Sequence, residues 1–342
     1  MKETIRALVE AFGPSGSEDR VRAVIRQQIE GLTDELYVDT LGNLIAVKKG
    51  HADAAVRRKI MLSAHMDEIG VIVGYVDKKG FVRINPIGGV RAGYELMGRV
   101  LFENGTVGVI AADKLDSPAQ LSMEKLYVDV GASRRKNCPV QVGDVGCFLR
   151  PMVEVGGHLV SKAMDDRIGC AVMVQALRDL SALPEGSPND VYFVFSTQEE
   201  VGLRGATTSA YGIEPDVGIA IDVTIAGDTP EPAFKMAVSL DKGPAIKVKD
   251  GGMLATPWVK EWMIGAAEAN EIPYQLEVLP GGTTDARAIQ TTQAGIAAGC
   301  LSIPTRYVHS PSETVSYSDV LESVKLLVAM IAGPVPAPEL GR

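Results

Sequence analysis

Residues 191–206 read VYFVFSTQEEVGLRGA, an apolar run that ends in two neighbouring glutamates and then in glycines. The apolar part predicts a buried strand, with Glu199 and Glu200 at its carboxyl end. Further buried strands are predicted for KIMLSAH at 59–65, VGIAIDV at 217–223 and IAAGCLSIP at 296–304. Helical patterns occur at 165–180, 256–270 and 317–332. Strands alternating with helices in this way predict a doubly wound α/β sheet.

The stretch 68–160 differs from the rest of the chain. Short Val- and Ile-rich pieces, such as IGVIVGYV and FVRINPIGG, are separated by Gly, Asn and Asp at hairpin spacing. This pattern predicts a small β-rich unit. Because predicted α/β elements lie on both sides of it, we expect one discontinuous domain, formed by 1–67 and 161–342, with the β-rich unit inserted.

The composition excludes several classes of function. The 342 residues carry a net charge of -9, with 46% hydrophobic residues. Nucleic acids and anionic membranes attract basic patches, so neither is an expected partner. No apolar run reaches the ~18 residues of a membrane span, and MKETIRALVEAFG has no apolar signal core. Four scattered cysteines without CxxC spacing predict reduced thiols. We therefore expect a cytoplasmic protein.

Charged residues gather where the predicted strands end. His65 closes 59–65, Asp222 follows VGIAI, and His309 comes shortly after 296–304. The pair Asp165-Asp166 precedes the apolar helix at 165–180. Ligands of open α/β sheets bind outside the carboxyl ends of the strands, where loops carry reactive groups. Two of the four histidines and several carboxylates are thus expected at one edge of the sheet.

Two imidazoles with three carboxylates are the ligand set of a site for one or two divalent ions. Zinc is the first choice, and cobalt or manganese also suit these ligands. Two ions need a bridging carboxylate and leave room for a shared water, which the ions acidify into a nucleophile near neutral pH. The pattern therefore predicts hydrolytic metal chemistry.

The paired glutamates fit such a site. Adjacent side chains on extended backbone point in opposite directions, so Glu199 and Glu200 are expected to have different roles. One binds metal and the other takes a proton from the water, and spacing alone leaves open which does which. Asp67 lies two residues after His65 and so shares its face, which suits a carboxylate that orients the imidazole. The alternative for Asp67 is an ordinary turn acid.

Six segments, in chain order, carry a resemblance to a known family. The chain resembles the glutamyl/leucyl aminopeptidase family of co-catalytic metallopeptidases, peptidase family forty-two, whose members include the tetrahedral TET peptidases. The matching segments are SAHMDEIG (63–70), KAMDDRIGC (162–170), STQEEVGLRGA (196–206), AIDVT (220–224), PGGTTDARAI (280–289) and RYVHSPSE (306–313).

The resemblance assigns roles residue by residue. It implies Asp165 as the bridge between two ions, His65 and Asp222 as ligands of one ion, and Glu200 and His309 as ligands of the other. It implies Glu199 as the general base and Asp67 as the support of His65. The implied fold is a phosphorylase/hydrolase-like α/β domain of the zinc-peptidase type, interrupted by a PDZ-like or barrel domain. That domain drives dimers, which assemble into twelve-subunit tetrahedral cages.

The leading hypothesis is the release of N-terminal amino acids from short peptides by a metal-bridged hydroxide. An amidase or deacylase acting on N-acyl amino acids on the same metal site is the main alternative. A glycosidase of the endoglucanase type ranks lower, because it needs two facing carboxylates and leaves His65 and His309 without a role. An inactive metal-binding shell subunit also ranks lower, because a structural ion needs no base such as Glu199.

Overall fold

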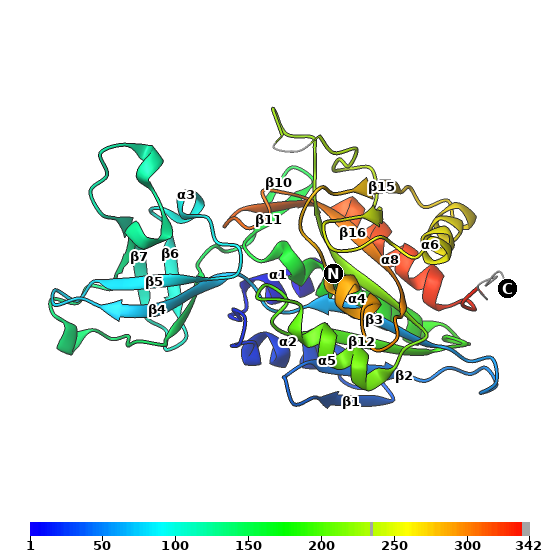
Figure 1. The fold of residues 1–342 in the computed structure, drawn as a ribbon. Coiled ribbons are helices and arrows are strands. Elements are labelled where there is room, and N and C mark those ends of the chain that lie inside the picture. Colours follow the sequence, from blue (N-terminus) through cyan, green and yellow to red (C-terminus); the bar gives the residue numbers. More distant parts are fainter. Residues whose placement is uncertain (233–234, 337–342) are drawn as a thin grey trace.

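The computed structural model describes residues 1–232 and 235–336 and has two parts (Figure 1). An α/β body contains an 11-stranded sheet, and a closed barrel of six strands projects from one side of it. The barrel is inserted between β3 and the strands that return to the sheet, so the predicted fold class is confirmed.

The main sheet is mixed, with parallel strands at its centre. Along the sheet the order is β1-β2-β12-β3-β13-β16-β17-β11-β10, and β14 pairs with β16 and with β15. β3 lies between β12 and β13 and is parallel to both. The strands are β1 (Glu35–Val38), β2 (Leu44–Lys48), β3 (Lys59–His65), β10 (Val153–Val155), β11 (His158–Ser161), β12 (Asp190–Ser196), β13 (Val217–Ile225), β14 (Ala245–Lys249), β15 (Gln275–Val278), β16 (Ala297–Arg306) and β17 (Glu313–Ser316).

Helices cover both faces of the sheet. Successive residues of a strand point to opposite faces, and the central strands carry apolar side chains on both. In β3, Ile60 and Leu62 belong to one buried cluster and Met61 to another. The first cluster is covered by α1 (Lys2–Glu10), α2 (Asp19–Ile29), α4 (Met164–Ala182), α6 (Pro257–Ala269) and α8 (Tyr317–Ile331). The second is covered by α5 (Arg204–Ile213) and α7 (Asp285–Gln290).

The barrel has its own apolar core. Its strands close in the order β4-β5-β8-β7-β6-β9, and its core contains Val71, Val82, Val100, Phe102 and Val128. The elements are β4 (Gly70–Val76), β5 (Val82–Ile87), α3 (Ala92–Glu95), β6 (Arg99–Phe102), β7 (Val107–Ala112), β8 (Leu126–Asp129) and β9 (Val145–Phe148). A closed barrel leaves no strand edge unpaired.

The segment after the barrel returns to the α/β body before residue 161. β10 pairs with β11, and β11 pairs with β17 of the main sheet. The barrel strands themselves therefore span 70–148. The division into a discontinuous domain, formed by 1–67 and 161–342, and an inserted domain, formed by 68–160, stays a prediction.

One local expectation was wrong. The strand VYFVFST ends at Ser196, so Glu199 and Glu200 lie in a turn after Gln198, whose φ is 56°. The pleat of a strand therefore does not separate them. β13 continues to Ile225, two residues beyond the predicted 217–223, and Asp222 lies within it as that prediction implies. Its neighbour β16 pairs with it in parallel along its whole length and extends it.

Candidate metal centre and active site

The residues predicted for the site come together around one cavity. It has a volume of about 740 Å³ and lies over the carboxyl ends of the central strands. His65 ends β3, Asp222 lies near the end of β13, and Asp165 lies in the first turn of α4. The lining also includes Glu199 and Glu200 from the turn after β12, and His309 from the loop after β16.

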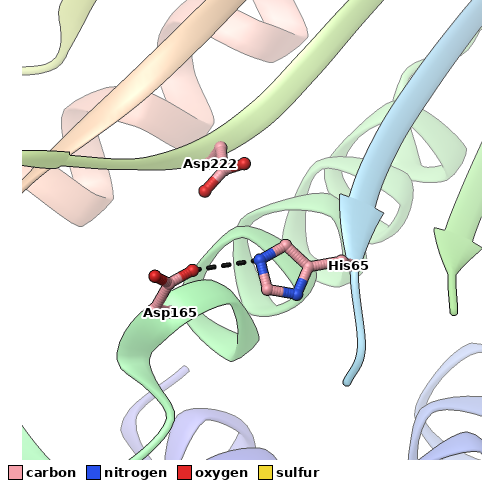
Figure 2. Close-up of side chains that lie close together, drawn as sticks. All are labelled: His65, Asp165 and Asp222. Atoms are coloured by element: carbon pink, nitrogen blue, oxygen red, sulfur yellow. Dashed lines mark hydrogen bonds and ion pairs between the residues drawn. The ribbon is translucent and has the colours of Figure 1, made fainter. Parts of the chain in front are cut away.

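Two groups of three side chains have the geometry of metal ligand sets. The first is His65, Asp165 and Asp222, shown in Figure 2 on β3, α4 and β13, and the second is Asp165, Glu200 and His309. In each group one ligand atom per residue lies within 4.8 Å of the others. Asp165 belongs to both groups, as a bridging carboxylate must.

Asp165 turns one oxygen toward each histidine. Its Oδ1 is 3.0 Å from His65 Nε2, and its Oδ2 is 3.3 Å from His309 Nε2. His309 Nε2 is also 3.2 Å from Glu200 Oε2. The two imidazoles thus lie on opposite sides of one carboxylate.

Glu199 and Glu200 approach the two groups differently. Glu200 contacts His309, whereas Glu199 Oε2 lies 3.9 Å from His65 Nε2 and belongs to neither group. The side chains of Glu199 and Glu200 are therefore separated by the turn at Gln198 and not by the pleat of a strand. Among the described carboxylates that line the cavity, Glu199 is therefore the one outside both ligand sets.

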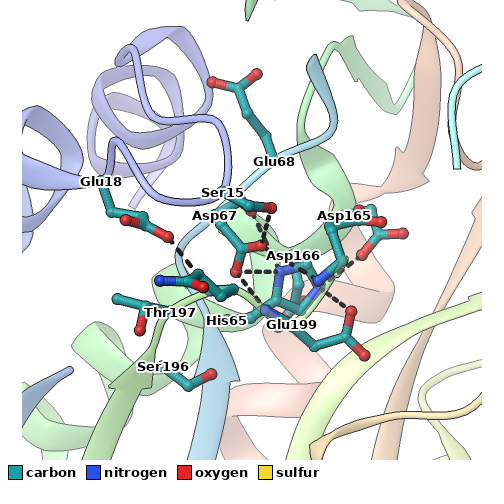
Figure 3. A network of polar contacts seen from close by, with 12 residues as sticks. Ser15, Glu18, His65, Asp67, Glu68, Asp165, Asp166, Ser196, Thr197 and Glu199 are labelled. Atoms are coloured by element: carbon teal, nitrogen blue, oxygen red, sulfur yellow. Dashed lines mark hydrogen bonds and ion pairs between the residues drawn. The ribbon is translucent and has the colours of Figure 1, made fainter. Parts of the chain in front are cut away.

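Asp67 connects His65 to the turn that carries the glutamates, as Figure 3 shows. The backbone N–H of Glu199 donates to Asp67 Oδ1 at 3.0 Å, and that of Glu200 donates to Oδ2 at 3.2 Å. His65 Nδ1 lies 3.2 Å from the Asp67 carbonyl oxygen and 3.5 Å from Oδ1. Asp67 thus contacts three residues of the site while lying outside both ligand groups.

Burial controls the charges of these acids. It raises the pKa of Glu199 and of Asp222 well above the usual range, and neighbouring carboxylates raise both further. Burial alone would also raise the pKa of Asp165, but contacts with His309 and His65 hold it below its usual range. For His309, burial lowers the pKa, yet Asp165 and Glu200 raise it to about 12. The site therefore has an excess of buried acid.

The residues present fit a pair of divalent cations. Two imidazole nitrogens and carboxylate oxygens are ligands that zinc, cobalt and manganese accept. Glu200 Oε1 is buried and has no hydrogen-bond partner in the part of the chain that the structure describes. A buried carboxylate oxygen without a donor is costly unless a cation or proton neutralises it.

Sequence patterns missed several residues that hold the site together. Glu313 accepts the backbone N–H groups of Asp165 at 2.9 Å and of His309 at 2.7 Å. Asp285 accepts the hydroxyls of Ser63, within β3, and of Ser196, the last residue of β12. The only sequence signal was that both acids fall inside the segments PGGTTDARAI and RYVHSPSE.

The inserted part also reaches the site. A Cβ at Gly89 would lie 2.3 Å from His309 Nδ1, and one at Gly88 would lie 3.0 Å from Glu200 Oε2. Only glycine fits such a close approach. The segment that follows β5 therefore forms part of the cavity wall.

Comparisons with known proteins agree with this site. The family model described as M42 glutamyl aminopeptidase matches residues 42–326. A putative aminopeptidase of Acetivibrio thermocellus is 48% identical, over 97% of this chain and 98% of its own. Lysyl aminopeptidase of Pyrococcus furiosus is 35% identical, over 96% of each chain.

Solved structures give the same result. An aminopeptidase from the archaeon Desulfurococcus kamchatkensis superposes with a TM-score of 0.91 at 40% identity, covering 99% of this chain and 98% of its own. The Pyrococcus horikoshii TET1 peptidase, whose structure is described as assembling into a tetrahedron or a large octahedral shell, superposes with a TM-score of 0.86 at 29% identity. That alignment covers 96% of this chain and 98% of the neighbour.

The fold and the site define a metal-dependent peptidase of the aminopeptidase class. The chain belongs to the M42 glutamyl aminopeptidase family. Members of this family use divalent metal ions, and the two ligand groups are where this chain has suitable donors. Among the described residues, no helix is both long enough and apolar enough to cross a membrane.

Proposed function

We propose that this protein releases N-terminal amino acids from short peptides with two divalent ions and with Glu199 as the general base. The observation that supports this best is the sharing of Asp165 between the two ligand groups, with Glu199 beside them and outside both. We propose His65, Asp165 and Asp222 as ligands of one ion, and Asp165, Glu200 and His309 as ligands of the other.

The ions, zinc first and cobalt or manganese next, would polarise the peptide carbonyl and lower the pKa of a shared attacking water. Glu199 would accept the proton of that water and later pass it to the leaving amine. Its buried position suits this role, because burial raises the pKa of a carboxyl toward the working pH of a proton carrier. Asp67 would fix the ring of His65 and the turn that holds both glutamates.

We also propose that the barrel is an oligomerisation domain, with dimers that assemble into a twelve-subunit tetrahedral shell. The support is the neighbour described as a tetrahedron or octahedral shell, which matches this chain over 96% of its length. Light scattering and electron microscopy of the purified protein test this, and a stable monomer would contradict it. A cytoplasmic location, as expected from the sequence, completes the proposal, and cell fractionation tests it.

The decisive experiment compares wild type with Glu199→Gln after chelation and reloading with zinc, cobalt or manganese. We expect wild type to cleave amino-acid p-nitroanilides and short peptides from the amino end. Glu199→Gln should retain both ions while kcat falls by roughly 10²- to 10⁴-fold, the usual contribution of a general base. Near-normal activity of the variant would overturn the assignment of the base.

The same assay separates the alternatives. N-acetyl amino acids, cleaved in preference to p-nitroanilides, would indicate the amidase or deacylase. Bound metal without hydrolysis of any peptide would indicate an inactive shell subunit. Cellulose cleavage without bound metal would indicate the endoglucanase.

A further inference from the structure

Three successive backbone N–H groups of the turn after β12 donate to buried carboxylates. Those of Glu199 and Glu200 donate to Asp67, and that of Gln198 donates to Glu18 Oε1 at 3.2 Å. Glu18 is 5% exposed and lies 180 residues away in the chain. An acid from the start of α2 thus reaches the turn that carries the two glutamates of the site.

The backbone of Gln198 needs support from its surroundings. Its φ of 56° lies in the left-handed region, which a residue other than glycine occupies only where neighbouring groups hold it. Arg204 gives part of this support, because its N–H donates to the Gln198 carbonyl oxygen at 3.3 Å and its Nη1 to Oε1 at 2.9 Å. The contact between these two side chains is exposed to solvent. Glu18 supplies the support from the buried side.

The side chain of Glu18 does not serve its own helix. Glu18 is the N-cap residue of α2, yet within the described part of the chain its carboxylate accepts no N–H group of that helix. Among the described residues it also forms no ion pair. Its Oε1 accepts the N–H of Gly16 at 2.8 Å in addition to that of Gln198. A buried carboxylate is costly without such bonds, so the bond to the turn is a main contact of this acid.

The loop before Glu18 also holds Asp67, as Figure 3 shows. Ser15 Oγ donates to Asp67 Oδ2 at 2.6 Å, and the N–H of Ser15 donates to the Glu68 carbonyl oxygen at 3.3 Å. The N–H of Glu68 donates in return to the Gly13 carbonyl oxygen at 3.1 Å. Residues 13–18 are therefore bound to the segment that follows β3, and Glu18 and Asp67 support the same turn.

We propose that Glu18 is a positioning residue of this enzyme, which fixes the turn at Gln198 and thereby the placement of Glu199 beside the ligand groups. The proposal rests on the proposed function, because it needs Glu199 as the base. Glu18 belongs to neither ligand group, so its effect passes through the backbone of the turn. A base acts only within hydrogen-bond reach of the proton that it takes, and a displacement of about 1 Å lowers a rate by as much as about 100-fold.

Two conservative substitutions separate the reach of the side chain from its charge. Glu18→Gln keeps the length and an oxygen that accepts the Gln198 N–H, so kcat should stay within about threefold of wild type. Glu18→Asp keeps the charge and a good N-cap residue but is one methylene shorter, so kcat should fall by about 10- to 100-fold. KM should change by less than about twofold in both, because Glu199 acts in the transition state.

The assay uses leucyl p-nitroanilide in excess metal, and metal analysis checks that both ions stay bound. Asp19→Asn is the matched control, since Asp19 also lies in the first turn of α2 but its side chain is 83% exposed. It should keep the wild-type kcat. A general weakening of the helix would affect this control as well as Glu18→Asp.

A second pair of substitutions tests whether the effect passes through the left-handed turn. In the Glu18→Asp background, Gln198→Gly and Gln198→Ala both remove the side-chain contact with Arg204, but only glycine adopts a positive φ without strain. The glycine double variant should therefore exceed the alanine double variant by about fivefold in kcat.

Four results would overturn the proposal. They are a wild-type kcat in Glu18→Asp, an equal loss in Glu18→Gln, an equal loss in Asp19→Asn, and equal kcat values of the two double variants.

Cleavage of the leucyl substrate by wild type shows separately whether the proposed function holds. If wild type cleaves nothing, hydrogen exchange of residues 197–204, measured by mass spectrometry, decides instead. Exchange about tenfold faster in Glu18→Asp than in wild type and Glu18→Gln, with α8 unchanged, would support the proposal that Glu18 fixes the turn. Equal exchange in all three proteins would overturn it.

Discussion

Two groups of buried charged residues lie on the same two chain segments but differ in what neutralises their carboxylates. The ligand groups contain His65 and Asp165, with an excess of acid. Three residues further along the chain from His65 lies Glu68, and three residues before Asp165 lies Lys162. Glu68, Lys162 and Arg167 form what we call the junction cluster, where the chain leaves and re-enters the α/β body.

In the junction cluster the protein itself supplies the counter-ions of the single carboxylate. Lys162 Nζ donates to Glu68 Oε2 at 2.7 Å, and Arg167 Nη2 lies 3.4 Å from Glu68 Oε1. Arg167 also donates to the carbonyl oxygens of Leu8 and Gly13. The ligand groups contain no lysine or arginine; burial raises the pKa of Asp222, and Glu200 Oε1 has no hydrogen-bond partner among the described residues. The difference teaches that a buried carboxylate paired with cations of the protein serves the fold, whereas an acid excess points to bound cations.

The largest expected effect comes from breaking the shared carboxylate. Asp165→Asn should lose bound metal at both groups and lower kcat/KM by roughly 10³-fold or more, because bound ions supply several kcal/mol of stabilisation. Metal content measured by plasma mass spectrometry, together with the p-nitroanilide assay, checks this.

The neighbouring acid is the matched control. Asp166 is fully buried but belongs to neither ligand group, and its Oδ1 accepts the backbone N–H of Gly169. Asp166→Asn should keep both ions. Equal metal loss in the two variants would mean that the acid excess as a whole, and not the bridge, holds the metal.

The junction cluster predicts a loss of stability instead of a loss of metal. Glu68→Gln leaves Lys162 and Arg167 buried without their carboxylate, which should lower the free energy of unfolding by about 3–5 kcal/mol. Urea denaturation followed by circular dichroism measures this.

An exposed pair provides the comparison. Lys2 and Glu154 form an ion pair with side chains 42% and 43% exposed, so Glu154→Gln should change stability by less than about 1 kcal/mol. If Glu68→Gln costs no more than Glu154→Gln, burial does not distinguish the two pairs. If it removes metal without loss of stability, the contrast between the clusters fails.

The barrel contains a third kind of buried acid, one that forms no hydrogen bond or ion pair among the described residues. Glu95 is 1% exposed, and neither carboxylate oxygen has a hydrogen-bond partner among the described residues. Burial raises its pKa to about 8, and Arg150 lowers it only in part. A proton neutralises this acid, whereas the ligand groups are suited to bind metal ions.

Glu95→Gln should therefore stabilise the barrel at high pH. Because the pKa is higher in the folded state, the stability contribution of Glu95 is complete below pH ~4.5 and is lost as the pH rises to about 8. The variant should gain on the order of 2 kcal/mol at pH 8.5 and little at pH 5. Hydrogen exchange of the barrel strands at both pH values tests this, and a gain that is independent of pH would contradict it.

The sequence predicted the central sheet because buried parallel strands are continuous apolar runs. Each of 59–65, 191–197, 217–223 and 296–304 lies in a strand to within a few residues of its end. It also predicted which segments carry the ligand groups, since the carboxyl ends of these strands meet at one edge. These features depend on local pattern and on a general rule of α/β sheets.

Other features depend on contacts between distant segments and leave little local signal. α5 is rich in threonine, alanine and glycine, and α7 has only six residues; neither helix was predicted. The turn at Gln198 was missed because its positive φ occurs at a residue that gives no such signal. Glu313 was missed because its role depends on two backbone N–H groups, one of them 148 residues away.

The smallest expected effect concerns Asp67, which lies in the chain between His65 of the ligand groups and Glu68 of the junction cluster. Burial alone would raise its pKa, but contacts with His65 and Ser15 lower it, so it stays ionised. Asp67→Asn places an amide N–H group near backbone donors and should lower metal affinity or kcat/KM by about 10- to 100-fold, the usual loss for a group that orients a ligand. Ser15→Ala, which keeps the carboxylate and removes one 2.6 Å hydrogen bond, should cost only a few-fold. Metal titration against a competing chelator and steady-state kinetics measure both. If Asp67→Asn changes neither quantity, Asp67 is an ordinary turn acid, and the turn that carries Glu199 and Glu200 holds its shape without it.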